Sequence, residues 1–584
     1  MTAILDVMAV RAIGDPDRAV FEAEPDGRVE EVACDVLVVG GGTGGISAAL
    51  AAARALHASG RVVLLEETDW IGGQLTAQGV SALDEHDHID RFGGTRSYYA
   101  LREAIRDHYR RLSSALVERH PNPGRCWVTR LAFEPRVALD VLTNMAGPFV
   151  DDGRLRILLR TKAVGAETRR DRVEAVLAIH LDERRWIRVR ARVVIDATEL
   201  GDLLALAAAE YVVGAEAKAE TGEPHAQPLQ AKPHCVQSFT YTFVLENAGA
   251  GAHHVIPRPE RYEHYRDSQP YSLRIHVHGG EIYGESTGWL DYAVMDRAPG
   301  TKGGLWTYRR LIDHTLFPGV HARDISMINW PGNDYRDESI LDRPPLAQAR
   351  ALQDAKRVSL GFLYWLQTEA PRPDGGRGWP ELRQRPDVFD TADGLGKYPY
   401  IRECRRLRGL GTIREQQVSA DYQPGARAEM FADSVGVGWY PIDIHRAGAD
   451  DVGVSCRTRP FQIPLGALVP IRVRNLIAGA KNLATTHITN GCYRLHPVEW
   501  NTGEAAGALA AFSLEIGHDA AAVHRDPTLR RAFQRRLAES GVPLYWFVDV
   551  SVDDPRFAEL QMAAVSGEII GAPDSLEAAA AKRR

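Results

Sequence analysis

Apolar strands and small-residue helices alternate in the first part of the chain. Residues 35–39 form a continuous apolar and β-branched run, which is typical of a strand covered on both faces in a parallel sheet. The alanine-rich stretch 46–57 then favours a helix, and a second apolar run at 61–65 ends at Glu66. This order predicts one βαβ unit near the N-terminus.

The same patterns return far along the chain. Strands are predicted at 154–160, 172–179 and 186–195, and a helix rich in alanine and leucine at 203–209. Residues 475–512 bring back a strand, a loop and a helix rich in alanine and glycine. The predicted fold class is therefore α/β: a Rossmann-like domain with a parallel sheet and a β-meander, assembled from discontinuous segments, with an inserted α+β substrate or cap domain.

Changes in composition suggest the domain boundaries. Residues 1–32 are polar and aperiodic, as in an N-terminal arm, and residues 33–212 form the first part of the nucleotide-binding domain. Residues 213–425 are rich in aromatic residues, proline, glycine and histidine, and are assigned to the substrate or cap domain. The nucleotide-binding domain returns at 426–518, and 519–584 form a C-terminal appendix.

Composition and charge favour an enzyme with small-molecule partners. The 584 residues are 45% apolar, and 70 basic against 77 acidic side chains leave a formal charge of −7, too mild and mixed for a nucleic-acid binder. No stretch approaches the roughly 18 uninterrupted apolar residues of a membrane-spanning helix, and the first ten residues lack the basic segment of a secretory signal. We therefore expect a cytoplasmic protein without a membrane partner.

The cysteines show neither a C-x-x-C pair nor zinc-like spacing. We therefore expect no metal site and no disulfide framework, and most of the thiols are expected to be buried. The six residues are Cys34, Cys126, Cys235, Cys404, Cys456 and Cys492.

A glycine-rich turn follows the first predicted strand and satisfies G-x-G-x-x-G. Such glycines allow a tight turn, close approach of a pyrophosphate and close packing of the following helix, whose N-terminal amides attract the anion. The expected contacts are Gly40, Gly42, Gly44 and Gly45. Glu66, followed by Glu67, ends the second strand, where a carboxylate can accept hydrogen bonds from a ribose. This pattern predicts a bound dinucleotide without separating NAD from FAD.

Three further segments resemble flavoproteins of the glutathione-reductase-like superfamily. Gly72-Gly73-Gln74 is similar to the double-glycine extension near the phosphates and ribityl chain of these proteins. Residues 193–198 resemble their second nucleotide-contacting strand, and 475–482 their late flavin-contacting strand and turn. The resemblance implies FAD as the cofactor. Glu199 stands where many relatives have glycine, so the backbone near the adenylate is expected to differ.

Within that superfamily, residues 34–516 resemble the FAD-dependent oxidoreductase family, which also carries segments of the types found at 72–78, 399–403 and 494–497. Thr76, Gln78 and Gly79 resemble the loop along the flavin ring of the fumarate reductase and aspartate oxidase group, with a plain turn as the alternative. Further cofactor contacts implied by the resemblance are Ala197, Thr198, Gly479, Asn482 and Gly503.

The sequence lacks two features of a disulfide reductase, namely a reactive cysteine pair after the first βαβ unit and a second dinucleotide fold. Reducing equivalents are therefore expected to come from an organic substrate and to leave to oxygen or another acceptor. Residues 84–88, Asp-Glu-His-Asp-His, are metal-like in composition only, and we expect a solvated or substrate-gating loop there.

Four residues are candidates for catalysis. Arg402 could clamp a carboxylate or stabilise an enolate, with a surface ion-pair cluster as the alternative. Asp443 and His445 alternate with apolar residues, so a strand would place both on one face as a carboxylate and an imidazole base, or as a buried core pair. His496 precedes a helix whose N-terminus would face the flavin, and is expected beside the ring or in a capping or packing role.

The first functional hypothesis is a dehydrogenase or oxidase that removes a hydride from a small polar metabolite. A flavin monooxygenase with an external reductant is the alternative. Residues 544–550, 557–561 and 567–574 resemble half of a surface-layer homology module, which implies cell-envelope binding. Because the copy is single and partial, a structural remnant packed on the enzyme is the preferred interpretation.

Overall fold

The computed structural model describes residues 2–25, 29–277, 288–295, 304–448 and 453–568. Its central sheet has the strand order β5-β4-β3-β8-β7-β6, with β21 beside β8. The strands are β3 (Val29–Val39), β4 (Val62–Leu65), β5 (Leu155–Leu158), β6 (Thr161–Arg169), β7 (Arg172–His180), β8 (Trp186–Asp196) and β21 (Leu476–Ala478). Strands β5, β4, β3, β8 and β21 pair in parallel, whereas β6, β7 and β8 form an antiparallel meander. The predicted fold class is confirmed.

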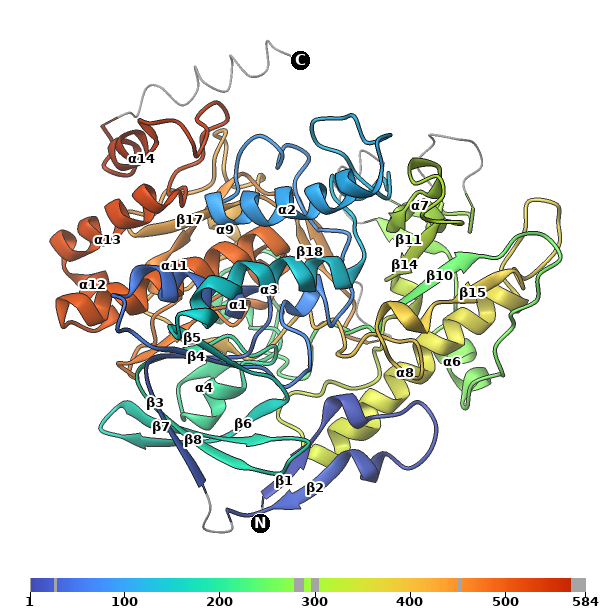
Figure 1. Ribbon diagram of the computed structural model, residues 1–584, viewed down its shortest axis with the longest axis horizontal. Coiled ribbons are helices and arrows are strands. Elements are labelled where there is room, and N and C mark those ends of the chain that lie inside the picture. The colour runs from blue at the N-terminus through green and yellow to red at the C-terminus, as the bar shows by residue number, and fades with distance from the viewer. Residues whose placement is uncertain (1, 26–28, 278–287, 296–303, 449–452, 569–584) are drawn as a thin grey trace.

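Helices α1 (Thr43–Ala55) and α11 (His496–Ile516) pack against each other beside this sheet (Figure 1). A Cβ atom on Gly503 would collide with the carbonyl of Gly44, and one on Gly507 with the carbonyl of Ala48. The small residues therefore let the two backbones approach, which explains why both helices are rich in alanine and glycine.

Two sheet strands differ from the sequence prediction. Strand β3 begins at Val29 because its first half continues the parallel pairing with β8, where Val29 lies opposite Trp186. Residues 29–32 thus belong to the sheet and not to the arm. Strand β6 was not predicted, because its side chains after the buried Thr161 are half-buried or exposed and give no apolar run.

The N-terminal arm is docked as a hairpin of β1 (Thr2–Leu5) and β2 (Val20–Ala23) against α8 (Pro345–Thr368) (Figure 1). The Gln353 amide on α8 donates to the carbonyls of Arg11 and Gly14. The arm therefore adds to the packing of the middle region of the chain.

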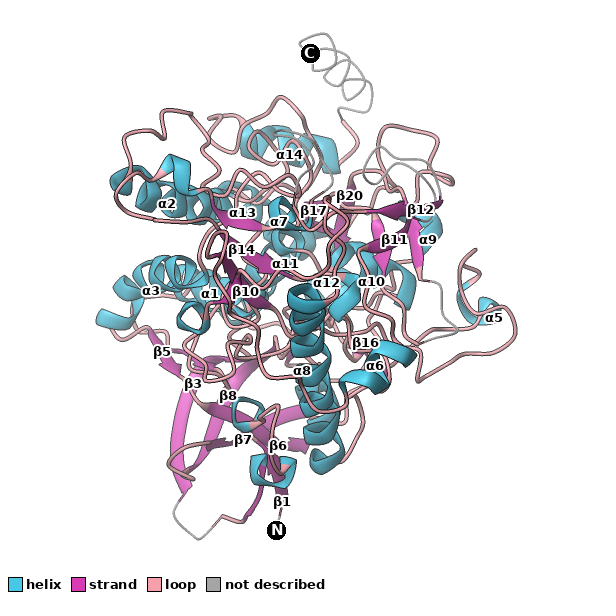
Figure 2. Ribbon diagram, turned by 90° about the vertical axis from the view of Figure 1, so that its right-hand side faces the viewer, coloured by secondary structure: helices cyan, strands magenta, loops and turns pink. Residues whose placement is uncertain are grey.

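The middle region has its own antiparallel sheet, of order β13-β14-β10-β15. Its strands are β10 (Phe243–Asn247), β13 (Arg310–Ile312), β14 (Ile325–Ile328) and β15 (Leu382–Gln384). A separate apolar core joins this sheet to α8, which crosses in front of the other elements in Figure 2. The shorter elements that bear on the site are α9 (Glu415–Val418), α10 (His487–Tyr493), β17 (Ser434–Gly438), β18 (Ile442–Ile444), β19 (Val454–Cys456) and β20 (Phe461–Pro464).

Further helices and strands complete the described fold. They are α2 (Arg96–Leu112), α3 (Pro135–Asp151), α4 (Asp202–Leu206), α5 (Lys218–Thr221), α6 (Tyr262–Ser268), α7 (Leu305–Tyr308), α12 (Ala520–Arg525), α13 (Pro527–Ser540), α14 (Phe557–Val565), β9 (Tyr211–Val212), β11 (Arg274–Val277), β12 (Gly288–Asp291) and β16 (Arg406–Leu407). Among the described helices, none combines the length and apolarity needed to cross a membrane.

The C-terminal segment is packed on the rest of the chain as far as residue 568. Gln534 of α13 donates to the carbonyls of Ala432 and Ser434, and the ring of Trp546 lies edge-on to Phe92 at 5.6 Å. Residues 569–574, the end of the segment that resembles a surface-layer module, lie outside the described residues.

Candidate functional site

The glycine turn between β3 and α1 lies at the carboxyl ends of the parallel strands. Gly40 has φ +94°, and a Cβ there would collide with the carbonyl of Ala197. A Cβ on Gly45 would collide with the carbonyl of Gly40, so the helix can begin at Thr43 only because both positions are bare. This geometry is that of a dinucleotide-binding turn.

Glu66 lies at the end of β4, in the cleft lined by Gly40, Gly42 and Gly73. Its carboxylate accepts the backbone N–H groups of Gly41 at 2.7 Å and Thr68 at 2.8 Å. Burial raises the pKa of Glu66 to about 7 in spite of these hydrogen bonds. The neighbouring Glu67 also lines the cleft and pairs with Lys162 at 2.7 Å.

The double glycine folds back over the first turn. Gly72 and Gly73 have φ +109° and +55°, and the Gly72 N–H donates to the Gly41 carbonyl at 2.7 Å. The Thr43 hydroxyl donates to the Gly72 carbonyl, and the Thr76 hydroxyl to that of Ile71. The two glycine segments therefore form one continuous cradle of bare backbone.

Gln78 carries a free amide group in the cleft. Both polar atoms of its side chain are buried and find no hydrogen-bond partner within the described part of the chain. A buried unpaired amide is costly, so it marks a place where a ligand supplies the partners. The backbone carbonyl of Gln78 accepts a hydrogen bond from the Thr242 hydroxyl at 2.8 Å. The next residue, Gly79, has φ +72° and packs against the ring of Phe389. An isoalloxazine edge, with donors and acceptors, fits this group.

Gln74 connects the cradle to the segment before α11. Its amide nitrogen donates to the Arg494 carbonyl at 3.2 Å and to the Glu499 carboxylate at 2.9 Å. The Gln74 Oε1 atom is buried without a partner among the described residues. The glycine cradle and the N-terminus of α11 are therefore joined directly.

Glu199 lies over the N-terminus of α1, the place that a pyrophosphate would take. A Cβ on Gly42 would meet its carboxylate, and one on Gly73 would lie 2.7 Å from it. Glu199 pairs with the buried ammonium of Lys481, which also lies 3.5 Å from Glu499. Burial opposes the charge on Lys481, but the two carboxylates outweigh it and hold its pKa above the usual range. Glu199 thus places a carboxylate at this helix N-terminus, and Lys481 is the cation that pairs with it.

Several other predicted contacts support the cleft from behind. Gly44 packs on the carbonyl of Gly479, and a Cβ on Gly479 would collide with Ile195. Asn482 donates to the Asp196 carbonyl at 3.0 Å and accepts the Ala480 N–H. The positions with this kind of placement are Gly44, Gly479, Asn482, Gly503 and the buried Ala197. Thr198 lines the cleft itself, and its hydroxyl donates to Asp196.

A second, larger cavity of about 350 Å³ lies next to the segment before α11. Aromatic side chains form much of its wall, among them Trp127, Tyr308 and Tyr400, and its charged lining is mainly cationic. The arginines are Arg274, Arg309, Arg336, Arg402, Arg446 and Arg494, and the carboxylates are Asp84, Asp334 and Asp443. This volume suits a small metabolite.

His445 projects into this cavity between two carboxylates. Its Nδ1 lies 2.7 Å from Asp334 and its Nε2 lies 3.5 Å from Asp443. The predicted juxtaposition of Asp443 and His445 on one face is thus present, and Asp334 is an additional partner. Burial alone would raise the pKa of Asp334, but Arg402 and His445 hold it below its ordinary value. The imidazole is therefore held between two carboxylates in the cavity wall.

Arg402 lies in the cavity wall and is buried, contrary to the surface-cluster alternative. Its guanidinium lies 3.1 Å from Asp334 and donates to the Ser238 carbonyl and the Thr240 hydroxyl. Its Nε is buried and has no partner among the described residues, and the same holds for the Nε atoms of Arg309 and Arg494.

His496 is the first residue of α11 and is fully buried, with both ring nitrogens bonded to the loop 80–84. Its Nδ1 accepts the Asp84 N–H at 3.0 Å, so its Nε2 donates to the Val80 carbonyl at 3.0 Å. Burial lowers the pKa of His496 to about 4, and Arg309 adds to the effect. Both ring nitrogens are engaged, so this residue holds the loop after Gln78 against α11.

The segment 84–88 is not a solvated loop. Asp84 pairs with Arg309 at 2.8 Å, Glu85 binds Arg102 through two hydrogen bonds, and His86 packs among aromatic rings. Its acids and histidines point in different directions, which is why they form no cluster of metal ligands among the described residues.

Asp334, Asn329, Arg309 and Arg494 are site residues that the sequence did not single out. Asp334 and Asn329 belong to the irregular segment 329–335, whose tryptophan, proline and glycine gave no periodic signal. Arg494 begins the segment 494–497, which resembles a segment of the FAD-dependent oxidoreductase family. That resemblance is the sequence signal that could have indicated Arg494 as a site residue.

The glycine cradle, the acid that ends β4 and the buried amide of Gln78 define a dinucleotide-binding flavoprotein. Residues 35–537 match the model of a family described as FAD dependent oxidoreductase, and the chain belongs to this family. It is an FAD-dependent oxidoreductase, and FAD is its cofactor. No curated protein sequence matches the chain.

Similar solved structures are distant. A variant of E. coli quinol fumarate reductase FrdA has 12% identity over 92% of this chain and 86% of that chain, with a TM-score of 0.30. A geranylgeranyl bacteriochlorophyll reductase-like protein from Thermoplasma acidophilum has 11% identity over 94% and 90%, with a TM-score of 0.31. The match to L-proline dehydrogenase from P. horikoshii has 18% identity and a TM-score of 0.18, and it covers 33% of this chain and only 25% of that protein.

Proposed function

We propose that the chain is a dehydrogenase or oxidase that removes a hydride from a small metabolite bearing a carboxylate or another anionic group. The observation that carries this proposal is the cationic cavity, in which six arginines face three aspartates. Three of these arginines bury an Nε donor that has no partner among the described residues. Guanidinium groups with spare donors are the usual means of binding carboxylates.

The remaining wall supports hydride removal from a carbon that bears a hydroxyl or amino group. Asp334 accepts the Nδ1 proton of His445, so the Nε2 atom of the neutral imidazole carries the lone pair that takes the proton of that group as the C–H bond breaks. Asp443, 3.5 Å from Nε2, then stabilises the imidazolium. FAD, when bound, accepts the hydride and passes the two electrons to oxygen or another acceptor.

In this proposal the cofactor contacts are those of the cleft. Glu66 and Glu67 bind the ribose end, Gly40, Gly42 and Gly73 the pyrophosphate, and Gln78 the ring edge. Lys481, released from Glu199, offsets the charge of the phosphates. The Gln74 hydrogen bond to the Arg494 carbonyl joins these contacts to the cavity wall, so the ring edge is expected to face His445.

The test is anaerobic bleaching of the flavin absorption by a panel of matched compounds. We expect 2-hydroxy or 2-amino carboxylates to bleach the flavin without a pyridine nucleotide, and their uncharged esters or amides to fail. Bleaching by uncharged or cationic compounds alone would refute the anionic substrate class. Bleaching only with an external reductant would favour the monooxygenase alternative.

A further inference from the structure

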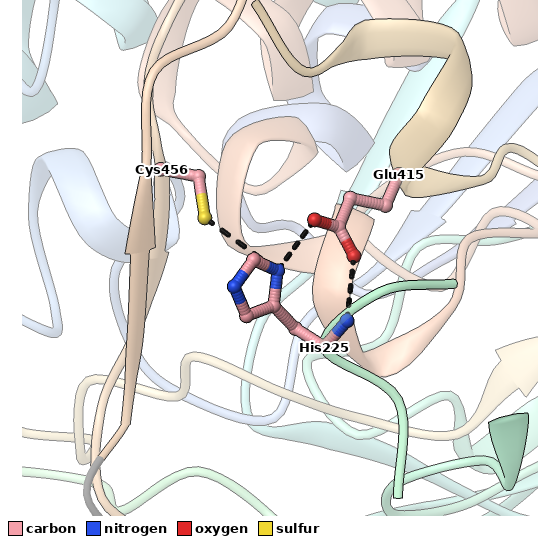
Figure 3. A group of neighbouring side chains, drawn as sticks. All are labelled: His225, Glu415 and Cys456. Carbon is pink, nitrogen blue, oxygen red and sulfur yellow. Dashed lines mark hydrogen bonds and ion pairs between the residues drawn. The ribbon is translucent and has the colours of Figure 1, made fainter. Parts of the chain in front are cut away.

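A histidine, a carboxylate and a thiol converge at a place away from both cavities. His225 lies in the loop after α5, Glu415 begins α9, and Cys456 ends β19 (Figure 3). Their nearest ligand atoms all lie within 4.8 Å of one another. Because the residues are separated by 190 and 41 positions, no spacing in the sequence could have shown the group.

The geometry points to a transition-metal site of zinc type, and we propose that His225 Nδ1, a Glu415 oxygen and Cys456 Sγ bind one Zn²⁺ ion. Nitrogen, oxygen and sulfur are the ligands that zinc prefers. Both partners face the same ring nitrogen: Oε1 lies 2.5 Å and Sγ 3.8 Å from Nδ1. An ion pair between His225 and Glu415 accounts for the shorter contact, and the buried thiol of Cys456 approaches the same ring nitrogen at the distance of a weak hydrogen bond.

The distances can accommodate the ion. Ligand atoms of a tetrahedral zinc lie about 3.5 Å apart, given bonds of about 2.0 to 2.3 Å. The Sγ to Nδ1 distance is already near this value. The shorter contact is a hydrogen bond. Zinc would replace its proton and increase the distance between Nδ1 and Oε1 by about 1 Å. Binding would release the Cys456 proton and the proton held between His225 and Glu415.

The surroundings fix the ligands and leave one side open. The second oxygen of Glu415 accepts the His225 N–H at 3.1 Å, and the Glu415 N–H donates to Glu223 at 2.8 Å. Glu415 and Cys456 are buried, whereas the His225 side chain is 44% exposed. Water can therefore complete a fourth position, as in zinc sites with three protein ligands.

The site lies behind the hairpin of the proposed base. In that hairpin Asp443 pairs with Ser455, and Ile442 pairs with Cys456. Ser455 lines the cavity, so the next residue, Cys456, points to the other face of the strand. A metal here would clamp β18 and β19 to α9, independently of the substrate proposed above.

The experiment measures zinc in the intact flavin-loaded protein after equilibration with zinc and removal of the unbound ion. We expect about one zinc per chain, with a sulfur ligand at about 2.3 Å in the X-ray absorption spectrum. Cys456→Ser and His225→Gln should each lower the affinity by at least about 10-fold. His264→Gln is the matched control, because His264 is similarly exposed and also faces a carboxylate, Asp337 at 3.9 Å, but belongs to no group of three metal-ligating side chains among the described residues.

A second measurement avoids variants that fail to fold. In the unchanged protein, alkylation is followed in urea below the unfolding transition, where buried thiols open transiently; zinc should slow the alkylation of Cys456 and leave that of the buried Cys404 unchanged. Alkylation of Cys456 at the same rate with and without zinc would overturn the proposal. So would one equivalent of zinc retained by the folded Cys456→Ser and His225→Gln proteins, or no zinc bound by the unchanged protein.

Discussion

The Nδ1 atom of His445 lies 2.7 Å from a carboxylate oxygen of Asp334, a residue 111 positions earlier in the chain. Asp334 is itself fixed by Arg402 at 3.1 Å and by the Thr240 hydroxyl. A segment of the middle region therefore orients the imidazole through its Nδ1 atom. Asp443, two residues before His445 in the chain, lies 3.5 Å from the other ring nitrogen, Nε2. The proposed base is thus assembled from two separate segments.

We expect His445→Gln to slow flavin reduction by about 100- to 10,000-fold, because the substrate proton loses its acceptor. Asp334→Asn should slow it less and change its pH profile, since the asparagine can no longer hold a charged imidazole. Rapid-mixing measurements of anaerobic bleaching give both rates. Unchanged reduction by His445→Gln, with FAD still bound, would exclude this residue as the base.

Arg402 and Asp334 are expected to be coupled in stability. Arg402→Met should lower the free energy of unfolding by about 3 to 5 kcal/mol, because it leaves a buried carboxylate without its guanidinium. The double variant Arg402→Met/Asp334→Asn should recover part of this loss. Urea unfolding of the four proteins measures the coupling. Additive losses would show that the pair does not interact.

A conservative substitution of Arg402 tests substrate recognition. Arg402→Lys keeps a charge but loses the planar fork, so KM for an anionic substrate should rise more than kcat falls. Steady-state kinetics with the best substrate of the panel decide this. A fall in kcat at unchanged KM would assign Arg402 to the chemical step and not to binding.

The sequence predicted the elements whose signals are local. The glycine turn, β4 and the acid that ends it were evident from residues 35–66, because backbone contact with a pyrophosphate demands bare positions in a fixed order. The alternation of Asp443 and His445 likewise predicted their shared face. Asp334 could not be found in this way, because a loop without a period carries no information about its partner across the fold. The position of His496 is fixed by hydrogen bonds with backbone groups of Val80 and Asp84. A pattern of side chains in the sequence does not reveal such contacts.

Glu199 is expected to weaken FAD binding. Its carboxylate lies over the helix N-terminus and neutralises Lys481, so Glu199→Gln should free the ammonium for the pyrophosphate. A gain of about 1 kcal/mol corresponds to an FAD affinity about fivefold tighter. Lys481→Met should act in the opposite direction. Titration of the flavin-free proteins with FAD provides the values, and weaker binding by Glu199→Gln would show that this carboxylate helps to hold the cofactor.

His496 should make the protein sensitive to acid. Burial lowers its pKa from the ordinary 6.5 to about 4. Between these two pH values the imidazole is protonated in the unfolded chain and neutral in the native chain. Stability is then fully present above pH 6.5 and is lost as the pH falls from 6.5 to 4, by about 3 kcal/mol in all. Urea unfolding across this range, with FAD saturating, should show a shallower pH dependence for His496→Asn. An equally steep dependence in that variant would assign the effect to other groups, such as the buried His86.

The contact between α1 and α11 should tolerate no side chain at Gly503. A Cβ there would meet the Gly44 carbonyl, so Gly503→Ala must push α11 away from the glycine turn. We expect a loss of about 1 to 3 kcal/mol in the free energy of unfolding, as for other overpacked cores, together with weaker FAD binding because Gly44 directly follows the glycine turn proposed to hold the pyrophosphate. Gly147→Ala is the control, because Gly147 lies inside α3 with nothing within 4 Å of the added Cβ. That change should alter the free energy of unfolding by less than about 1 kcal/mol, because Pro148 restricts the residue before it and offsets the gain in helix propensity. If Gly503→Ala were as stable as Gly147→Ala and bound FAD equally well, the close packing of the two helices would not be what holds the turn in place.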